Sequence, residues 1–387
     1  MNKQLPLVSR WTSFKNIFRI VKNPIPVLNE YTEVKGDTFL MFMGGTRKSI
    51  FTVDPELVQY VLQKNNRNYR KSEIQTQQIG QFAGKGLLTT NGSYWLRQRR
   101  LIQPGFHRAK LEAITATMLQ VVKEAFAEFD ELATKKVTFD IAEEMTKLAF
   151  RMVAKSLFTT SVSEKELMML SDNIQEIQEF IVRSLRQPYL KWWFKLSGWE
   201  RKQFRQAKES REIILKVIKE RRESGETHED LLDMLLEARY EDTNEGMTDQ
   251  QLLDESLILF VAGHETSANA LAWTFYLLCE NPEAVEKIKN EYQEIVGNRE
   301  LQFSDFPKLT FTTQVIQEAM RLYPPAWITD RLANESDEFK GTKIPKDFMV
   351  APYIYGLHHS KKLWDEPEKF KPERFTKENM KAKPAFA

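Results

Sequence analysis

Apolar residues recur every three or four positions along most of the chain after residue 92, which is the spacing of amphipathic helices. Turn signals such as Gly225, Asn244-Glu245-Gly246 and Asn281-Pro282 separate the periodic stretches. The pattern predicts helices over about 93–103, 108–133, 141–158, 163–184, 199–223, 228–239, 248–280, 282–296 and 311–322. No repeat of about 20–50 residues is visible in the sequence, which argues against a helical solenoid.

The two ends of the chain have a different pattern. Thr38–Met43 and Ser49–Val53 are rich in β-forming residues and predict a hairpin. Asp54-Pro55 then predicts the start of a helix that runs to about Leu62, because Asp is a good N-cap and Pro suits the first helical position. The 35 or so residues before the hairpin are expected to be irregular. Ile344-Pro345, Phe348–Ala351 and Tyr353–Tyr355 predict short strands and loops after residue 324.

Composition supports a mainly helical protein. Gly and Pro together make up 15 + 15 = 30 of 387 residues, about 8%, against an average near 12%. Formal charge is 56 − 54 = +2, which gives no reason to expect a nucleic-acid partner. We therefore predict a mainly α fold with a small β region, forming one domain over 1–387 with its β segments at about 37–53 and 324–356.

One segment, Leu257–Leu278, is long enough on paper to cross a bilayer. Polar residues from His264 to Asn269 occupy its centre, where a charge costs about 2.5–3.5 kcal/mol. We therefore interpret it as the central helix of a large core and predict no transmembrane segment. A single cysteine, Cys279, and the lack of a signal-peptide pattern lead us to expect a cytoplasmic protein.

The polar centre of that segment reads Ala262-Gly263-His264-Glu265-Thr266. A zinc-binding HExxH motif would need a second His where the chain has Ala268. Ala262 and Gly263 leave one helix face without bulk, so a large flat group could approach the backbone beside Glu265 and Thr266. The alternative is a small-residue crossing point between packed helices, with Thr266 hydrogen bonded to its own turn.

A second motif pairs Glu318 with Arg321, three residues apart on a predicted helix. Their neighbours are apolar, so the pair is expected to be buried and to need a further partner. Arg374, in the later sequence Pro-Glu-Arg-Phe, offers a second guanidinium for the same carboxylate.

A third motif is Trp95 and Arg99, four residues apart on the first long predicted helix. An indole N–H and a guanidinium on one face can together bind a carboxylate. The alternative is a Trp packed beneath a basic, solvated face, which is also the simplest interpretation of Arg97 and Arg100.

Together and in this order, these motifs resemble the haem-thiolate monooxygenases of the cytochrome P-450 family. The match covers most of the chain, from the hairpin to Pro-Glu-Arg-Phe, and the joint spacing of the motifs is specific. The resemblance implies a cytochrome P-450-like fold with haem b as the cofactor. It also implies insertion of one oxygen atom from dioxygen into a hydrophobic organic substrate.

The resemblance assigns cofactor contacts to five residues. Trp95 and Arg99 would bind one haem propionate, and Arg331 would bind the other. Ala262 and Gly263 would lie over the porphyrin beside the oxygen site.

The same resemblance assigns catalytic and structural roles. Glu265 and Thr266 would be the catalytic acid–alcohol pair that delivers protons to dioxygen. Glu318, Arg321 and Arg374 would form a structural triad on the haem side of the core.

One departure from the family concerns the iron ligand. In the family this ligand is a cysteine in a loop that follows Pro-Glu-Arg-Phe, whereas this chain ends at Ala387 before such a loop. Cys279 lies four turns beyond Gly263 on the same predicted helix and is not placed to substitute. No metal ligand is therefore assigned, and we expect an incomplete sequence of an active enzyme, truncated before the ligand loop and the last helix.

The predicted activity is a haem-dependent monooxygenase whose electrons derive from NAD(P)H through a separate ferredoxin, flavodoxin or diflavin reductase. Arg97 and Arg100 are candidate docking charges for that partner. One alternative is a catalytically inactive helical protein that binds hydrophobic ligands. Another is a peroxide-using haem relative, against which the presence of Glu265-Thr266 argues. A fatty acid or another lipophile is the expected class of substrate, by resemblance to similar sequences.

Leu190–Leu196 joins two long predicted helices, and in the family this joint forms a lid over substrate access. It holds three adjacent aromatics, Trp192, Trp193 and Phe194, between lysines, a composition that could also contact a membrane surface peripherally. The alternative is that these aromatic side chains fold back into the core.

Overall fold

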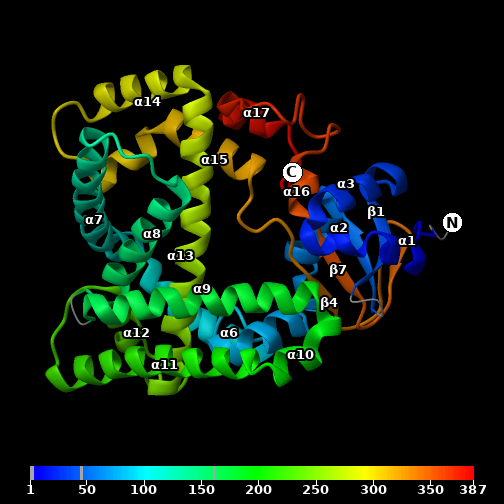
Figure 1. Ribbon diagram of the computed structural model, residues 1–387, viewed down its shortest axis with the longest axis horizontal. Coiled ribbons are helices and arrows are strands. Elements are labelled where there is room, and N and C mark those ends of the chain that lie inside the picture. Colours follow the sequence, from blue (N-terminus) through cyan, green and yellow to red (C-terminus); the bar gives the residue numbers. More distant parts are fainter. Residues whose placement is uncertain (1–3, 44–46, 160–161) are drawn as a thin grey trace. The chain divides into compact units, whose positions relative to one another are not determined.

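The computed structural model describes residues 4–43, 47–159 and 162–387. The described chain divides into two compact units (Figure 1). The first unit contains the described residues up to Glu73, together with Val182–Lys191 and Phe311–Ala387. The second unit contains the described residues of Ile74–Ile181 and Trp192–Thr310.

Helices account for most of the described chain. They are α1 (Arg10–Lys15), α2 (Ile17–Lys22), α3 (Pro24–Lys35), α4 (Pro55–Gln59), α5 (Gly80–Ala83), α6 (Gly92–Ile102), α7 (Arg108–Thr134), α8 (Ile141–Phe158), α9 (Glu164–Arg186), α10 (Lys191–Leu196), α11 (Trp199–Ser224), α12 (Leu231–Glu237), α13 (Asp249–Glu280), α14 (Pro282–Ile295), α15 (Thr310–Leu322), α16 (Ile354–His358) and α17 (Lys377–Lys381). The strands are β1 (Thr38–Met43), β2 (Arg47–Thr52), β3 (Tyr69–Arg70), β4 (Arg331–Ala333), β5 (Asp337–Phe339), β6 (Thr342–Ile344) and β7 (Met349–Pro352).

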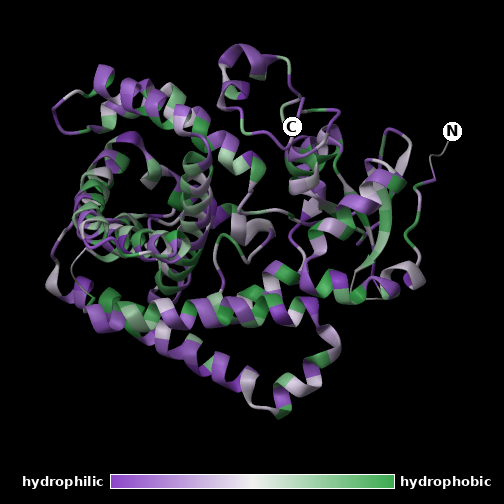
Figure 2. Ribbon diagram, turned by 45° about the horizontal axis from the view of Figure 1, so that its top comes forward, coloured by the Kyte–Doolittle hydropathy of each residue, from purple (hydrophilic) through white to green (hydrophobic). Residues whose placement is uncertain are grey.

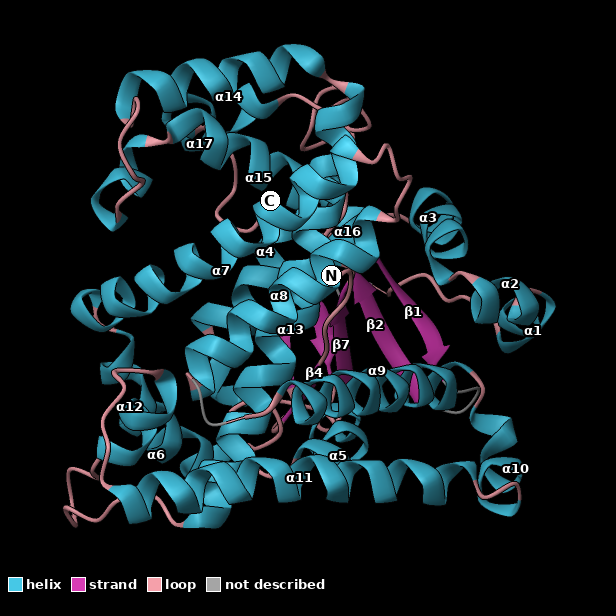
Figure 3. Ribbon diagram, turned by 60° about the vertical axis from the view of Figure 1, so that its left-hand side comes forward, coloured by secondary structure: helices cyan, strands magenta, loops and turns pink. Residues whose placement is uncertain are grey.

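A five-stranded sheet in the order β1-β2-β7-β4-β3 forms the base of the first unit (Figure 3). β2 pairs with β7 in parallel, and the other neighbours are antiparallel. The register joins Phe39 to Phe51 across the hairpin, and their rings stack with centroids 5.8 Å apart. This sheet confirms the predicted small β region, in which an early hairpin and a late strand lie side by side.

Three helices, α1, α2 and α3, occupy most of residues 10–35, so the prediction of an irregular opening was wrong for that stretch. The Ser9 side chain accepts the Thr12 N–H at the start of α1, and the Asn23 side chain accepts the Ile25 N–H at the start of α3. Pro24 is the first residue of α3, where a missing N–H costs little. Of the three late segments predicted as short strands and loops, Ile344 ends β6 and Phe348–Ala351 mostly forms β7, whereas α16 occupies most of Tyr353–Tyr355.

The second unit is built around α13, the longest helix. Its Phe260 ring packs against Phe150 of α8 with centroids 4.9 Å apart, inside the largest apolar core of the described residues. The α9 and α11 helices lie side by side, since Asn173 donates to the Gln206 carbonyl oxygen at 3.3 Å. Figure 2 shows hydrophobic and hydrophilic residues alternating around both helices, as the predicted periodicity requires.

The mainly α prediction is confirmed, and each of the nine predicted helices is present with ends that differ by at most three residues. The helix predicted to run from Pro55 to about Leu62 ends at Gln59 and continues as a π-helical turn over Tyr60–Lys64. Among the helices that the structure describes, none combines the length and the apolar character needed to span a bilayer.

Candidate functional site

The polar centre of α13 presents different residues on its two sides. Ala262, Glu265 and Thr266 are exposed, whereas His264 is only 3% exposed. The His264 ring lies edge-on to Phe150 of α8, with centroids 5.4 Å apart. Burial lowers the pKa of His264, so the imidazole is held neutral beneath the helix and away from its open side.

Gly263 faces α8 and permits a close helix crossing. A Cβ added there would lie 3.2 Å from the Val153 Cγ2 atom, closer than most packed side chains come. Gly263 thus permits close packing against α8, and exposed Ala262 adds little bulk on the open side of α13. That these two residues lie over a porphyrin stays a prediction.

Thr266 and Glu265 differ in their hydrogen bonds. The Thr266 hydroxyl donates to the Ala262 carbonyl oxygen at 2.6 Å, one turn earlier on the helix. This bond occupies the hydroxyl proton but leaves the oxygen lone pairs able to accept. Glu265 makes no hydrogen bond or ion pair with another residue in the described part of the chain. Although its side chain is exposed, the surrounding protein desolvates the charged form and raises the pKa of Glu265.

The structure brings Glu318, Arg321 and Arg374 together in the first unit. Arg321 Nε donates to Glu318 Oε2 at 2.7 Å and Arg321 Nη2 donates to Oε1 at 2.8 Å. Arg374 Nε reaches the same Oε1 at 3.3 Å, and the Lys371 N–H donates to it at 2.9 Å. The Glu318 side chain is 0% exposed and that of Arg321 1%. Four donors therefore satisfy one buried carboxylate, which is what a charge needs in order to be tolerated in a core.

Arg321 also ties this cluster to the chain that follows α16. Its Nη1 donates to the His358 carbonyl oxygen at 2.8 Å, and its guanidinium lies 5.2 Å from the ring centre of the buried Trp364. The cluster thus fixes α15 to the segment around α16, which is a structural arrangement.

Trp95 and Arg99 lie one turn apart on α6. The Arg99 guanidinium is 5.5 Å from the Trp95 ring centre, within cation–π range. Arg99 is exposed and forms no ion pair within the described ranges, whereas Arg97 on the same helix pairs with Asp242 at 3.1 Å. Arg99 is therefore the cation of the two that is available to an anionic group.

Arg331 is the first residue of β4. Its Nη1 donates to the Asp330 carbonyl oxygen at 2.6 Å, and no acidic side chain of the residues described pairs with it. Burial lowers the pKa of Arg331 without removing its charge, because a guanidinium stays protonated in proteins. Neither Arg99 nor Arg331 forms an ion pair within the described ranges, so each guanidinium taken by itself has the charge that a haem propionate would need. The donor set present thus fits the group that the sequence implied.

Cys279 is exposed near the C-terminal end of α13. It lies 279 − 263 = 16 residues beyond Gly263, about 24 Å at 1.5 Å per residue. Within the part of the chain that the structure describes, no group of three or more His, Cys, Asp or Glu side chains could hold a metal ion.

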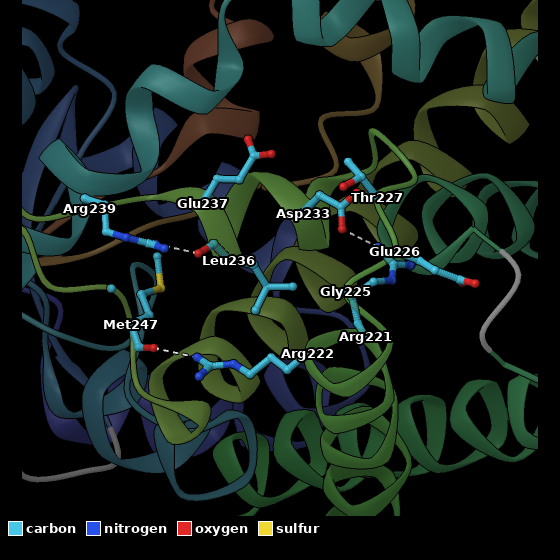
Figure 4. A pocket seen from close by; sticks show the side chains of 11 residues that line it. Arg221, Arg222, Gly225, Glu226, Thr227, Asp233, Leu236, Glu237, Arg239 and Met247 are labelled. Carbon is cyan, nitrogen blue, oxygen red and sulfur yellow. Dashed lines mark hydrogen bonds and ion pairs between the residues drawn. The ribbon is translucent and has the colours of Figure 1, made fainter.

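A pocket of about 650 Å³ lies at the ends of α11 and α12, and none of the site residues predicted from the sequence lines it (Figure 4). Its cations already have acceptors: Arg221 pairs with Asp233, Arg222 donates to the Met247 carbonyl oxygen, and Arg239 donates to that of Leu236. Because each of these cations already has an acceptor, we do not take this pocket as the candidate site.

The segment that the resemblance predicts to be a lid, Leu190–Leu196, forms α10 from Lys191 onward, between α9 and α11 (Figure 1). Trp192 and Trp193 are 60% and 52% exposed, whereas Phe194 is buried against Phe180 and Trp199. The interpretation that the aromatics fold back into the core is therefore correct for Phe194 and wrong for the two tryptophans.

A mainly helical chain with a small mixed sheet, an open carboxyl–hydroxyl pair on its longest helix and a buried Glu–Arg–Arg cluster has the features of a haem-dependent oxidoreductase. The Cytochrome P450 family model matches residues 5–387, and the chain belongs to this family.

Similar proteins include ones named as a monooxygenase, a synthase and a hydroxylase. The chain is 33% identical to a cyclooctat-9-en-7-ol 5-monooxygenase of Streptomyces melanosporofaciens, over 89% of this chain and 74% of that protein. It is 31% identical to a cyclooctatin synthase of the same organism, over 87% and 72%. It is 31% identical to a cytokinin hydroxylase of Arabidopsis thaliana, over 92% and 71%. The chain is thus an oxidoreductase of the haem monooxygenase type.

Sequence reasoning missed a set of buried polar side chains in the second unit. Asp254 and Glu255 stand just before the apolar segment that begins at Leu257, yet they are 5% and 0% exposed. Gln98, between Trp95 and Arg99 on α6, is 1% exposed. The sequence did contain one indication of this burial, because two adjacent acidic residues precede an apolar stretch. Burying charges there costs free energy unless hydrogen-bond or ion-pair partners are present.

Proposed function

We propose that Glu265 and Thr266 deliver protons to dioxygen during monooxygenation of a hydrophobic substrate. The observation that carries this proposal is the environment of Glu265, a carboxyl without partners among the described residues, with a raised pKa, next to a hydroxyl on the open side of α13. A carboxyl whose pKa is shifted toward neutrality exchanges protons more readily near physiological pH. Thr266 can accept a proton on its oxygen while passing on its own.

Trp95, Arg99 and Arg331 are proposed to hold the propionates of haem, and Ala262 to leave room beside the porphyrin. When bound, haem supplies the redox chemistry that activates dioxygen. The part of this chain is to orient the group, to exclude bulk water and to move protons at Glu265 and Thr266. Electrons are proposed to come from a separate ferredoxin, flavodoxin or diflavin reductase, with exposed Arg100 as a docking charge.

Replacing Thr266 by Ala tests the proton-delivery proposal. In the full-length enzyme with its reductase, we expect product formed per electron consumed to fall about fivefold or more, with peroxide released instead. Thr274→Ala is a matched control, because the Thr274 hydroxyl makes the same 2.6 Å bond to a carbonyl oxygen one turn earlier, that of Ala270. Equal product yield per electron in the two variants would show that Thr266 is a packing residue.

Replacing Arg99 by Gln tests the propionate contact. We expect haem affinity to fall about tenfold, because a hydrogen bond to a charged group contributes about 1.5–3 kcal/mol. Arg97→Gln is the control on the same helix, since Arg97 already pairs with Asp242. Equal haem affinity in both variants would remove Arg99 from the cofactor site.

A second proposed role, carried by the exposure of Trp192 and Trp193, is that α10 contacts lipophilic substrate or a membrane surface. Trp192→Ser with Trp193→Ser should weaken both liposome binding and substrate affinity. Unchanged values for both would leave the tryptophans without either role.

A further inference from the structure

Two adjacent carboxylates of α13 bind the backbone of the segment between α5 and α6. The Lys85 N–H donates to Asp254 Oδ2 at 2.9 Å, and the Leu87 N–H donates to Glu255 Oε2 at 3.0 Å. Asp254 is also held from α11 by an ion pair with Arg211 and from its own helix by Gln250, whose Nε2 donates at 2.8 Å. The segment is thus fixed to α13 through buried, charge-assisted hydrogen bonds.

Glycines make this close approach sterically feasible. A Cβ on Gly84 would overlap the Asp254 carboxylate, and Gly84 has φ +86°, a conformation that side-chain-bearing residues rarely adopt. A Cβ on Gly86 would lie 2.7 Å from Glu255 Oε2 and 2.8 Å from the Ile258 side chain. The Gly84-Lys85-Gly86 sequence and the Asp254-Glu255 pair therefore fit one another as a unit.

A second route of hydrogen bonds returns to α13 through α6. The Tyr94 hydroxyl donates to the Lys85 carbonyl oxygen at 3.4 Å, and Gln98 Nε2 donates to the Tyr94 hydroxyl at 3.2 Å. The same Gln98 nitrogen donates to the Tyr240 hydroxyl at 3.0 Å, which also accepts from Gln251 Nε2 at 3.1 Å. Gln251 lies one turn before Asp254, so the bonds close into a ring that starts and ends on α13.

The ring includes side chains of α6 that lie next to the proposed cofactor contacts. Gln98 is three residues after Trp95 and one before Arg99. On α13, Glu255 and Thr266 are 266 − 255 = 11 residues apart, about three turns, so they share a helix face. The ring therefore links the helix with the proposed propionate contacts to the helix with the proposed proton donors.

We propose that Gln98 and Asp254, as members of this closed ring, and Glu255, which holds the same segment at Leu87, are positioning residues that fix α6 against α13. They act through Trp95 and Arg99 and touch no substrate themselves. The inference rests on the proposed function, because its consequence for the enzyme depends on Arg99 contacting haem.

The test measures haem release from the full-length, haem-loaded protein by transfer to apomyoglobin. Gln98→Leu removes both donor bonds with little change in volume, and we expect release to be about fivefold faster, the factor that one lost buried hydrogen bond represents. In an Arg99→Gln background the same substitution should accelerate release less than about twofold, because the two changes act along one route. The control is Gln120→Leu, which removes an exposed Gln bond to Glu124 on α7.

Amide hydrogen exchange gives a readout that does not depend on haem. Gln98→Leu and the milder Tyr94→Phe should both speed exchange at the Lys85 and Leu87 amides, although neither residue bonds those amides directly. Tyr94→Phe keeps the test available should Gln98→Leu fold poorly, since Tyr94 is 38% exposed.

The outcomes separate this inference from the proposed function. If Arg99→Gln leaves haem release unchanged, the propionate contact has failed, and the exchange result alone decides whether the ring exists as a unit. If Arg99→Gln speeds release but Gln98→Leu only lowers the unfolding midpoint, the ring merely stabilises the fold and the positioning role is overturned. Unchanged exchange at Lys85 and Leu87 in both variants would overturn the ring itself.

Discussion

Glu318 and Glu265 are two carboxyls on helices of the same chain in opposite environments. Glu318 is 0% exposed and accepts from Arg321, Arg374 and the Lys371 backbone. Glu265 is exposed and has no partner in the described ranges. One charge is fully compensated and fixed in place, and the other is free to change its protonation state.

The difference separates a structural carboxylate from a functional one. A buried charge surrounded by donors stabilises a single conformation, since losing one partner leaves the others uncompensated. A carboxyl without partners contributes little to folding and keeps its capacity for proton exchange. Stability should therefore depend strongly on Glu318 and hardly at all on Glu265, while the reaction should show the reverse dependence.

The largest expected effect comes from Glu318→Gln. The substitution leaves two arginines in the core without their counter-charge, so we expect a loss of about 3–5 kcal/mol in the free energy of unfolding, measured by urea denaturation. Glu286→Gln is the matched control, because Glu286 and Lys289 also form a Glu–cation pair three residues apart, with both side chains 66% exposed. That control should change stability by less than about 1 kcal/mol. Similar losses in the two variants would contradict the assignment of Glu318 to a buried structural cluster.

A smaller effect concerns His358, whose backbone Arg321 holds. Burial, with the Arg321 charge nearby, lowers the pKa of His358 from 6.5 to about 4. Between these values the unfolded chain binds a proton that the folded protein does not, so stability falls as pH drops from about 6.5 to 4. The loss should reach about 2–3 kcal/mol at pH 4, at 1.36 kcal/mol per pKa unit.

His358→Gln separates this contribution from other acid effects. The variant should lose less stability than the wild type between pH 7 and pH 4, in chemical denaturation at matched ionic strength. If both proteins lose stability in parallel over that range, His358 is not the group that titrates.

Helical periodicity made most of the second unit predictable, because amphipathic patterning and Asn-Pro or Gly signals mark the ends of long helices such as α13 and α14. The helices α1–α3 were not predictable in the same way, since Pro24 signals either a break or a helix start and only the Asn23 cap distinguishes them. Strands as short as β3 and β4 have too few residues to show alternation, and their pairing joins positions more than 260 residues apart.

The residues of the candidate site also differ in how far the sequence alone predicts them. Glu318, Arg321 and Arg374 could be linked from the sequence because a buried pair demands a further partner. Gly263 faces α8, whereas Ala262 lies on the open side of α13. This difference depends on how α8 and α13 cross, and the sequence pattern of one helix does not contain that information. The closed ring of hydrogen bonds through Gln98 joins a loop, the helices α6 and α13, and Tyr240. Its residues are far apart in the sequence, so local spacing could not identify them.

A still smaller effect is expected from Thr266→Ala on stability. Thr266 is exposed and its bond returns to its own turn, so the free energy of unfolding should change by less than about 0.5 kcal/mol in denaturant titrations. Thr274→Ala removes the same local bond from a side chain that is 7% exposed, so about 1 kcal/mol should be lost through packing. If Thr266→Ala lowers the free energy of unfolding more than Thr274→Ala does, Thr266 is a structural residue like Glu318.

The smallest effect concerns the pH dependence that Glu265 adds to stability. Its pKa is raised above the ordinary 4.5 in the folded protein, because the surroundings desolvate the ionised form. Between the two values the folded protein binds the proton more strongly than the unfolded chain, so stability falls as pH rises through this window. The Glu265→Gln variant lacks this titrating group. Its free energy of unfolding should therefore rise slightly relative to that of the wild type between pH 4 and pH 7, and the exposure of the side chain keeps the difference small. The measurement is the difference in unfolding midpoint at the two pH values. If the variant instead becomes less stable relative to the wild type as pH rises, Glu265 has a cationic partner in the folded enzyme. The contrast with Glu318 would then disappear.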